Sequence, residues 1–325
     1  MATQTRYAPD RGLTVRMTAT MFLLGLVFVA FVALIIGIMS AAHSSAGAII
    51  VVALVFGGGS AFISLFYSDK IALAAAGARE VSPRQAPELH GIVDRLCALA
   101  DMDKPRVAIA PTRMPNAFAT GRNSKNSVLC VTEGLLYNSG LTQEELEGVL
   151  AHELSHVAHK DVQVMTVASL LAIVAGLLVR FAFYSELFGG GRRGGNNSQA
   201  ALLIPLIMLA SVVVYAISFL LIRLLSRYRE LAADRSGALL TQNPSALISA
   251  LTKVSQGMNR IPTQDLRAAE PLNAFYFAPA MKLTGGGAGL STLFSTHPSL
   301  DKRIEQLNKI QRQLGGTDPS PRGLR

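Results

Sequence analysis

The feature that most constrains this chain is a long segment near its beginning without any formal charge. From Met17 to Ser68, 52 consecutive residues include no Asp, Glu, Lys or Arg. About 20 apolar residues are enough to cross the hydrocarbon of a bilayer. The segment divides at the short polar sequence 41–46, so we predict a hairpin of two transmembrane helices, over 17–40 and 47–67. A cleaved signal peptide is disfavoured, because its apolar region spans only about 7–15 residues and no second span would follow it.

The charges that flank the hairpin predict its orientation. Lys and Arg lie on both outer flanks but not in the turn between the two helices. These flanking residues are Arg6, Arg11, Arg16, Lys70, Arg79 and Arg84. Because cytoplasmic segments carry the excess of Lys and Arg, both ends of the hairpin are expected in the cytoplasm, with residues 1–16 as a cytoplasmic N-terminus.

Composition is consistent with a chain that lies partly in a bilayer. Half of the residues are hydrophobic, only 16% are charged and the mean hydropathy is +0.37, whereas soluble domains average about 25% charged residues. The net charge of +9 fits attraction to anionic lipid headgroups. The basic residues are scattered and show no zinc-finger spacing. We therefore expect the lipid bilayer as a partner and no nucleic acid.

A domain outside the bilayer is expected to begin with residues 69–161. Apolar residues recur at helical spacing over 88–102. Short strands are expected at 106–110, 116–120 and 127–131. The two cysteines, Cys97 and Cys130, belong to no CxxC pair, which leaves either free buried thiols or a single disulfide.

Two further apolar runs follow, within residues 162–226. Val162–Val179 is uncharged over 18 residues, and it would span the membrane, lie at its interface or pack against the soluble domain. Ala200–Ile222, uncharged over 23 residues, is the better candidate for a span. A Gly/Arg-rich loop at 189–197 separates them.

The rest of the chain is polar. Residues 227–313 are expected to form the second, mostly helical part of the soluble domain, interrupted by a loop at Gly285–Gly289. Residues 314–325 are expected to be a disordered tail.

The most informative segment is His152-Glu-Leu-Ser-His156. Thr142 and Glu145 have the spacing of a capping box, which opens a helix that runs through it. Positions four apart lie on one face of a helix, so both imidazoles can meet a single ion. Glu153 would then contact a water in the open coordination position of the ion and take its proton as the water attacks a carbonyl. The pattern indicates a zinc-dependent peptide hydrolase.

Two histidines are too few for a catalytic zinc, which usually has three protein ligands and a water. No metzincin continuation follows His156. Glu230 lies on a strongly helical stretch downstream and would complete a His₂Glu site. Asp234, one turn further, would accept the N–H of a ligand histidine and orient it. A Glu and an Asp at this spacing ordinarily lie on a solvent-exposed face of a helix. The metal site is favoured here only because the His-Glu-x-x-His motif lies upstream.

Two other segments are candidates for supporting roles. Asn116, Ala117 and Phe118 belong to an expected strand that is either an edge strand, on which substrate pairs by strand addition, or an interior strand. His297, which precedes Pro298, would either donate a hydrogen bond to the oxyanion of the transition state or serve as a structural histidine.

With these motifs in this order, the chain resembles the HtpX heat-shock membrane proteases of the gluzincin group. The resemblance covers nearly the whole chain and rests on the N-terminal hairpin, Pro115-Asn-Ala-Phe-Ala-Thr-Gly-Arg122, Glu147-Gly-Val-Leu-Ala-His-Glu-Leu-Ser-His156, Asp161, Ser226-Arg-Tyr-Arg-Glu-Leu-Ala-Ala-Asp234 and Ser295-Thr-His-Pro-Ser299. The Gly/Arg insertion at 189–195 departs from the family pattern.

The resemblance implies one zinc ion per chain, held by His152, His156 and Glu230, with Glu153 as the catalytic base. It also implies a multi-pass protein of the bacterial inner membrane with its active site facing the cytoplasm. The implied activity is endoproteolysis of damaged or misfolded membrane proteins under stress, with other quality-control proteases as possible partners. The fold class that we expect is an α+β membrane protein, mostly helical, with a small sheet packed on the helix of the His-Glu-x-x-His motif.

Three other readings compete with this one. An intramembrane metalloprotease would carry the motif inside a span, but here charged residues flank it, which a bilayer core disfavours. These residues are Glu144, Glu145, Glu147, Lys160 and Asp161. A CAAX-type prenyl protease is expected to need more than four membrane helices. A non-enzymatic membrane protein with structural zinc would need a fourth ligand, which His297 would supply.

Overall fold

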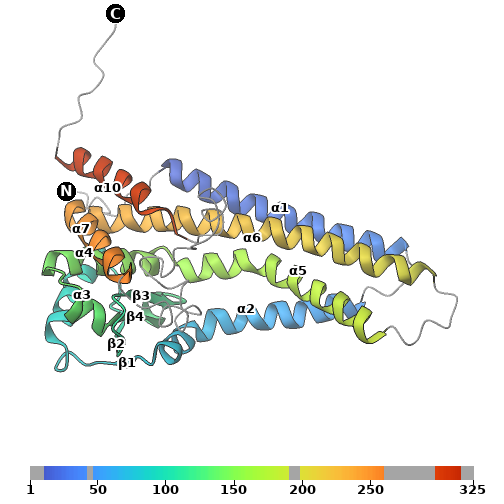
Figure 1. The fold of residues 1–325 in the computed structure, drawn as a ribbon, viewed down its shortest axis with the longest axis horizontal. Coiled ribbons are helices and arrows are strands. Elements are labelled where there is room, and N and C mark those ends of the chain that lie inside the picture. Colours follow the sequence, from blue (N-terminus) through green and yellow to red (C-terminus); the bar gives the residue numbers. More distant parts are fainter. Residues whose placement is uncertain (1–10, 42–46, 190–197, 260–296, 316–325) are drawn as a thin grey trace, which may run out of the picture. The chain divides into compact units, whose positions relative to one another are not determined.

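A computed structural model describes residues 11–41, 47–189, 198–259 and 297–315 (Figure 1). The chain forms two compact units, which are described separately. Unit 1 contains Met1–Thr14, Phe66–Val162 and Ser226–Arg325; unit 2 contains Val15–Leu65 and Gln163–Leu225. Several predicted segments lie outside the described residues: the first ten residues of the N-terminus, the turn at 42–46, the Gly/Arg-rich loop at 190–197, the loop at 285–289 and the tail from 316 onward.

A mixed sheet of four strands in the order β1-β2-β4-β3 lies in unit 1. The strands are β1 (Arg79–Glu80), β2 (Arg106–Ala110), β3 (Ala117–Gly121) and β4 (Ser127–Thr132). The central pair, β2 and β4, is parallel, while β1 and β3 pair antiparallel on either side. Strand β3 is therefore at an edge of this sheet. The sequence did not predict β1, because two residues show no alternation to detect.

Helices cover both faces of the sheet, which explains why its central strands are apolar throughout. Successive side chains of a strand point to opposite faces. Val107 and Leu129 pack in the larger core cluster with α3 (Pro87–Ala100) and α4 (Gln143–Ala158). Their neighbours Ala108 and Cys130 pack on the other face with Ala72, near the end of α2 (Gly47–Ala76).

Helix α4 begins where the sequence predicted, and its capping box is confirmed. Thr142 Oγ1 accepts from the Glu145 N–H at 3.3 Å, and the Glu145 carboxylate accepts from the Thr142 N–H at 2.8 Å. The same carboxylate accepts from Ser249 Oγ (2.5 Å) and Lys253 Nζ (2.7 Å) of α7 (Pro244–Asn259). The start of α4 is thereby held to α7.

Unit 1 is completed by η1 (Ser124–Asn126), the π-helical turn η2 (Gly134–Asn138), the end of α6 (Ser198–Thr241) and α10 (Leu300–Leu314).

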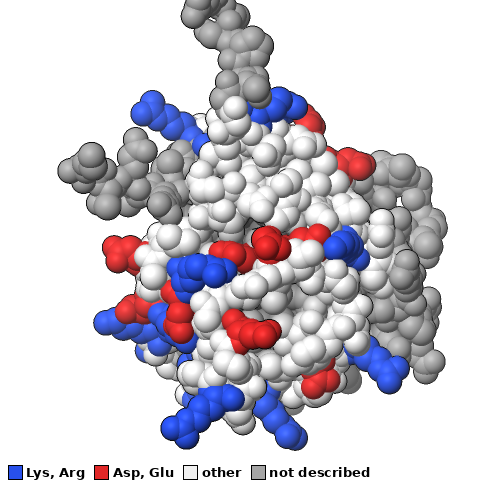
Figure 2. Space-filling view, turned by 90° about the vertical axis from the view of Figure 1, so that its left-hand side faces the viewer, with Lys and Arg blue, Asp and Glu red and all other residues white. Residues whose placement is uncertain are grey.

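Figure 2 shows a face of the molecule on which acidic and basic side chains are intermixed. Such a mixed-sign surface is ordinary for protein in water. The long helices of unit 2 differ from this surface, because many of their exposed side chains in the described part of the chain are large and apolar.

Parts of four long helices form unit 2 in the described part of the chain. Helix α1 (Arg11–Ala41), α2, α5 (Asp161–Gly189) and α6 contribute to it. Among the described residues, Arg11–Gly37, Asp161–Arg180 and Pro205–Thr241 are long and apolar enough to cross a membrane. The side chains of most of the apolar part of α2 lie outside the described residues.

Packing inside unit 2 uses only part of the described surface of α1, α5 and α6. Leu24 and Phe31 of α1, Leu171 and Ala175 of α5 and Leu225 of α6 belong to one buried cluster. Other large apolar side chains of these helices are exposed, among them Phe22, Leu26, Val29, Leu209 and Val213. Exposed apolar surface of this extent is expected on helices that face lipid. The predicted fold class, a mostly helical α+β membrane protein with a small sheet, is confirmed.

Cys97 and Cys130 are free, buried thiols. Of the two alternatives left open by the sequence, the structure therefore shows free thiols and not a disulfide. Cys97 lies in the larger core cluster and Cys130 on the opposite face of the sheet. Burial, with a smaller contribution from Asp94, raises the pKa of Cys97 to about 11, and burial raises the pKa of Cys130 to about 12. Both thiols are therefore poor nucleophiles.

Helices α4 and α6 pack closely at Gly237. A Cβ atom added there would lie 2.9 Å from the backbone nitrogen of His152 and 3.1 Å from its Cα. Backbone atoms cannot rotate away as the end of a side chain can. The glycine therefore sets the distance between the two helices.

We predict that Gly237→Ala destabilises the protein by about 1–3 kcal/mol, as overpacked core positions do. The matched control is Gly91→Ala in α3, where nothing lies within 4 Å of the added Cβ. There the better helix propensity of alanine should leave stability unchanged or raise it by up to about 1 kcal/mol. Thermal unfolding in detergent measures both, and equal midpoints for the two variants would contradict the close packing.

Candidate metal centre

Two imidazoles and one carboxylate meet between α4 and the end of α6. His152 and His156 lie one turn apart on α4, and their Nε2 atoms are 3.3 Å from each other. Glu230 of α6 places Oε1 3.5 Å from His156 Nε2 and Oε2 3.8 Å from His152 Nε2. One ligand atom from each of the three residues lies within 4.8 Å of the others, so the group could hold a metal ion.

The spacing of these atoms fits a zinc ion. Zn–N bonds of about 2.0–2.1 Å in a tetrahedral site put two nitrogen ligands about 3.3 Å apart, which is the separation of the two Nε2 atoms. Two imidazoles and a carboxylate are also a donor set that suits zinc. Among the described residues this group has three members, which is the number that leaves a coordination position open.

A buried carboxylate lies behind each histidine. His152 Nδ1 is 3.0 Å from Asp234 Oδ1. Arg303 of α10 donates to both oxygens of Asp234, from Nε at 2.7 Å and from Nη2 at 2.6 Å. All three side chains are almost completely buried. The arginine therefore fixes the carboxylate, and the carboxylate fixes the imidazole with its Nε2 toward Glu230.

The same arrangement recurs behind His156. Its Nδ1 is 2.5 Å from Asp161 Oδ2, and the buried Arg229 pairs with the Asp161 carboxylate and donates to its backbone carbonyl at 2.8 Å. Asp161 can reach back because Lys160 has a φ of 55° and turns the chain sharply between α4 and α5.

The electrostatic environment favours neutral imidazoles next to an ionised glutamate. Burial lowers the pKa of His152, and it lowers the pKa of His156 to about 4. Burial alone would raise the pKa of Glu230, but His297, His156 and His152 around it bring that pKa well below its ordinary value. Neutral histidine and ionised carboxylate are the protonation states that bind a metal.

Glu153 faces β3 from the same helix. Its Oε2 accepts a hydrogen bond from the Ala119 N–H at 3.2 Å. Burial, followed by the negative charge of Glu230, raises the pKa of Glu153 well above its usual value. A carboxyl group in this environment holds a proton more readily than an exposed one, which suits a group that must both accept and return a proton.

The remaining predicted residues lie around this centre. His297 Nδ1 is 3.0 Å from Glu230 Oε2, so His297 contacts a member of the group without being part of it. Asn116 is buried. Its N–H donates a hydrogen bond to Thr132 Oγ1 at 2.9 Å, and its carbonyl accepts one from the Thr132 N–H at 2.9 Å. Ala117 and Phe118 are the first residues of β3.

No role was expected from the sequence for Arg303, Arg229 or Asp161. A signal for Arg303 was present: it shares a helical stripe with Leu307 and Ile310, and all three are buried. An arginine in an apolar stripe indicates a charge that is paired in the interior. Nothing comparable marks Arg229, whose partner Asp161 is 68 positions away.

Comparison with known proteins agrees with this picture. The family described as "Peptidase family M48" matches residues 83–311 of the chain. That range includes every residue of the metal centre. The match defines the chain as a peptidase of a metalloprotease family. Its long apolar helices are suited to a membrane.

Curated relatives extend the similarity to nearly the whole chain. "Protease HtpX homolog 1" of Streptomyces coelicolor is 57% identical over 98% of this chain and 99% of its own length. "Protease HtpX homolog" of Moorella thermoacetica is 49% identical over 94% of this chain and 96% of its own. The chain belongs to the HtpX family within peptidase family M48. A crystal structure of S. mikatae Ste24p matches with a TM-score of 0.44 at 16% identity, covering 92% of this chain and 66% of that one.

We predict that Asp234→Asn weakens zinc binding by about 10–100-fold, the usual effect of removing a carboxylate that orients a ligand histidine. Asp161→Asn should act in the same direction through His156. Competition with a chelator measures the affinity, and circular dichroism checks that each variant is folded. The control is Asp94→Asn on α3, an exposed carboxylate paired with Lys104. A folded Asp234→Asn protein with unchanged zinc affinity would remove Asp234 from this role.

Proposed function

We propose that this chain is a zinc-dependent endopeptidase that cleaves misfolded or damaged membrane proteins as part of quality control under stress. The observation that carries the proposal is the convergence of His152, His156 and Glu230 on one point, with Glu153 beside it on the same helix. His152, His156 and Glu230 are the proposed ligands of one zinc ion. When bound, zinc would polarise a peptide carbonyl and lower the pKa of a water.

The chain's own residues would supply the proton transfer. Glu153 takes a proton from the attacking water and returns it to the nitrogen of the leaving amine, so no covalent intermediate with the protein is needed. The raised pKa of Glu153 favours its protonated form between these two steps. Asp234 and Asp161 hold the imidazoles in the orientation that keeps both Nε2 atoms toward Glu230.

His297 is proposed to stabilise the oxyanion. Its Nδ1 faces Glu230, so only Nε2 is available to face a substrate. A histidine that donates from both nitrogens must carry both protons. His297 can therefore donate to the oxyanion in its cationic form, while its neutral form would only orient Glu230.

Strand β3 is proposed to bind the substrate backbone. The Asn116 carbonyl accepts from the Thr132 N–H, so in the antiparallel pair with β4 the alternate residues Ala117 and Ala119 direct their N–H and C=O groups away from β4. The Ala119 N–H does reach Glu153. An extended peptide that adds at this edge would use the backbone of Ala117 and Ala119 and pass beside Glu153.

The number of ligands supports a catalytic metal over a structural one. A closed structural zinc site has four protein ligands, and the group found among the described residues has three. His297, the residue that would have completed a closed site, instead contacts a carboxylate oxygen of Glu230. An open position is what a peptide hydrolase needs.

The proposed location is the bacterial inner membrane, with unit 1 in the cytoplasm. Its support is the flanking arginines and lysines of the N-terminal hairpin. The proposed partners are the lipid bilayer and protein substrates, with other quality-control proteases acting alongside.

We predict that Glu153→Gln keeps about one zinc per chain but lowers the rate of casein hydrolysis by about 10²–10⁴-fold or more, since a general base contributes that much. Zinc content and hydrolysis are measured in detergent for the variant and for the wild type. The control is Glu147→Gln on the same helix, whose carboxylate pairs with Arg95 at 2.6 Å; its activity should match the wild type. Full activity in Glu153→Gln would contradict the mechanism. A wild type that binds zinc without hydrolysing casein would favour a structural metal.

We also predict the orientation of the chain. Ser44→Cys should react with a membrane-impermeant maleimide in intact cells, whereas Lys125→Cys should react only after the membrane is permeabilised. The native thiols give little background, because Cys97 is 4% and Cys130 0% exposed. The opposite labelling pattern would place the metal centre outside the cytoplasm.

A further inference from the structure

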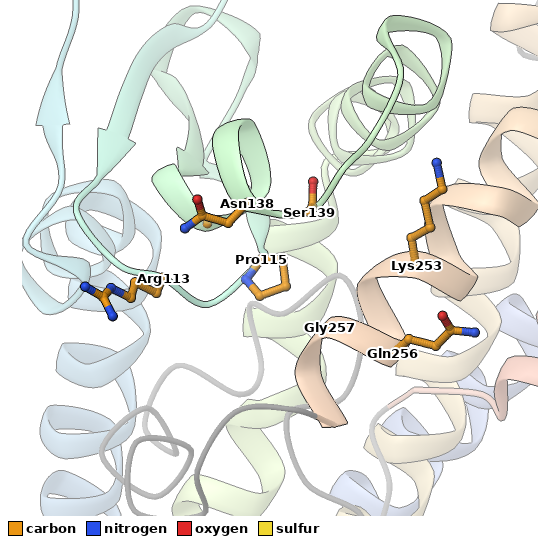
Figure 3. A pocket seen from close by; sticks show the side chains of 8 residues that line it. Arg113, Pro115, Asn138, Ser139, Lys253, Gln256 and Gly257 are labelled. Atoms are coloured by element: carbon orange, nitrogen blue, oxygen red, sulfur yellow. The ribbon is translucent and has the colours of Figure 1, made fainter.

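A pocket of about 280 Å³ lies in unit 1 at the start of β3, away from the metal centre. Three segments line it: the loop that leads into β3, the end of η2 and the last turns of α7. Figure 3 shows Arg113 and Pro115 on the loop, Asn138 at the end of η2, and Lys253 and Gln256 on α7.

The loop side of this pocket is held firmly. The Gly134 N–H donates to the Thr112 carbonyl at 2.8 Å, and a Cβ at Gly134 would lie 2.1 Å from the Arg113 carbonyl oxygen. Thr132 Oγ1 donates to the Met114 carbonyl at 2.6 Å. The π-helical turn thus packs directly on the loop. The pocket is a built feature of the fold.

The pocket lies in line with the proposed substrate strand. Pro115 has no N–H, so a peptide paired with Ala117 and Ala119 must leave the strand edge there. Ala119, whose N–H contacts Glu153, is four positions after Pro115, and at about 3.3 Å per residue this is about 13 Å. Antiparallel pairing is the more stable arrangement. In that arrangement the peptide's carboxyl side runs toward Pro115.

The charges of the lining favour an acidic group. Both ionisable residues that line the pocket, Arg113 and Lys253, are basic. Lys253 is balanced by Glu145 at 2.7 Å. Arg113 is exposed and has no ion pair within the described part of the chain. In Figure 3 its side chain lies on the loop, on the far side of Pro115 from Gln256. The amides of Asn138 and Gln256 add hydrogen-bond donors.

We propose that this pocket is a substrate subsite that selects an acidic side chain about four residues after the bond that is cut, the distance that the strand spacing gives. The inference rests on the proposed peptidase function and names a feature of its substrates. Arg113 is the residue that recognises the carboxylate, and Gln256 lies at the wall of the pocket.

The test uses the zinc-loaded full chain in detergent with a random peptide library, and mass spectrometry of the products. Asp and Glu should be enriched at one position three to five residues after the cut, as the spacing of about 3.3 Å per residue implies. Two synthetic peptides with Glu or Gln at that position should then differ in kcat/KM by about fivefold, the effect of one exposed ion pair.

Variants separate this subsite from the metal centre. Arg113→Ala should bring the Glu-to-Gln ratio of kcat/KM to about one, and Arg113→Lys should restore most of it, because the charge is retained. Gln256→Trp, which fills the pocket, should also abolish the preference. The control is Arg84→Ala, an exposed arginine elsewhere in unit 1, which should keep the wild-type ratio.

The outcomes distinguish the two proposals. If the wild type cleaves peptides without acidic enrichment at these positions, or if the preference survives in both Arg113→Ala and Gln256→Trp, the subsite is overturned while the peptidase function stands. If the wild type binds zinc and cleaves no peptide, the peptidase function is overturned and the subsite with it.

Discussion

The interaction on which the rest of unit 1 depends is the pairing of buried charges behind the two histidines. Removing Asp234, Arg303, Asp161 and Arg229 from water is expensive, and each carboxylate is compensated only because an arginine meets it inside the protein. The pairs join segments that are far apart in the sequence. Arg303 ties α10 to α6, and Arg229 ties α6 to the start of α5. Structure and proposed chemistry therefore share the same contacts: the groups that hold the helices together also orient the imidazoles.

Close packing and hydrogen bonding around α4 complete this arrangement. Gly237 lets α6 approach the backbone of His152, which brings Glu230 within reach of both imidazoles. On another side, the Ala119 N–H of the sheet edge meets Glu153. The helix that carries the motif thus lies against α6, α7 and the sheet. One consequence is that the proposed base, the proposed ligands and the proposed substrate strand have fixed positions before any substrate arrives, as efficient catalysis requires.

Much of the fold followed from the sequence, because its signals are local. A long uncharged segment has few alternatives to a membrane helix, and the capping box at Thr142 marks a helix start through bonds to residues three positions away. The His-Glu-x-x-His spacing places two imidazoles on one helix face for the same reason. Strands β2, β3 and β4 were visible as apolar runs of suitable length. The two-residue β1 and the π-helical η2 carry no such local pattern.

What the sequence by itself determined is therefore the class of the protein and the identity of the residues in its central motif. Only the tertiary structure decided which distant side chains complete the centre: Arg303 behind Asp234, Arg229 behind Asp161, and His297 against Glu230. It also decided that β3 lies at an edge of the sheet and that a pocket opens where the strand begins. The physical reason is that these features arise from contacts between residues tens of positions apart, whereas propensity, capping and periodicity act over a few residues along one helix or strand.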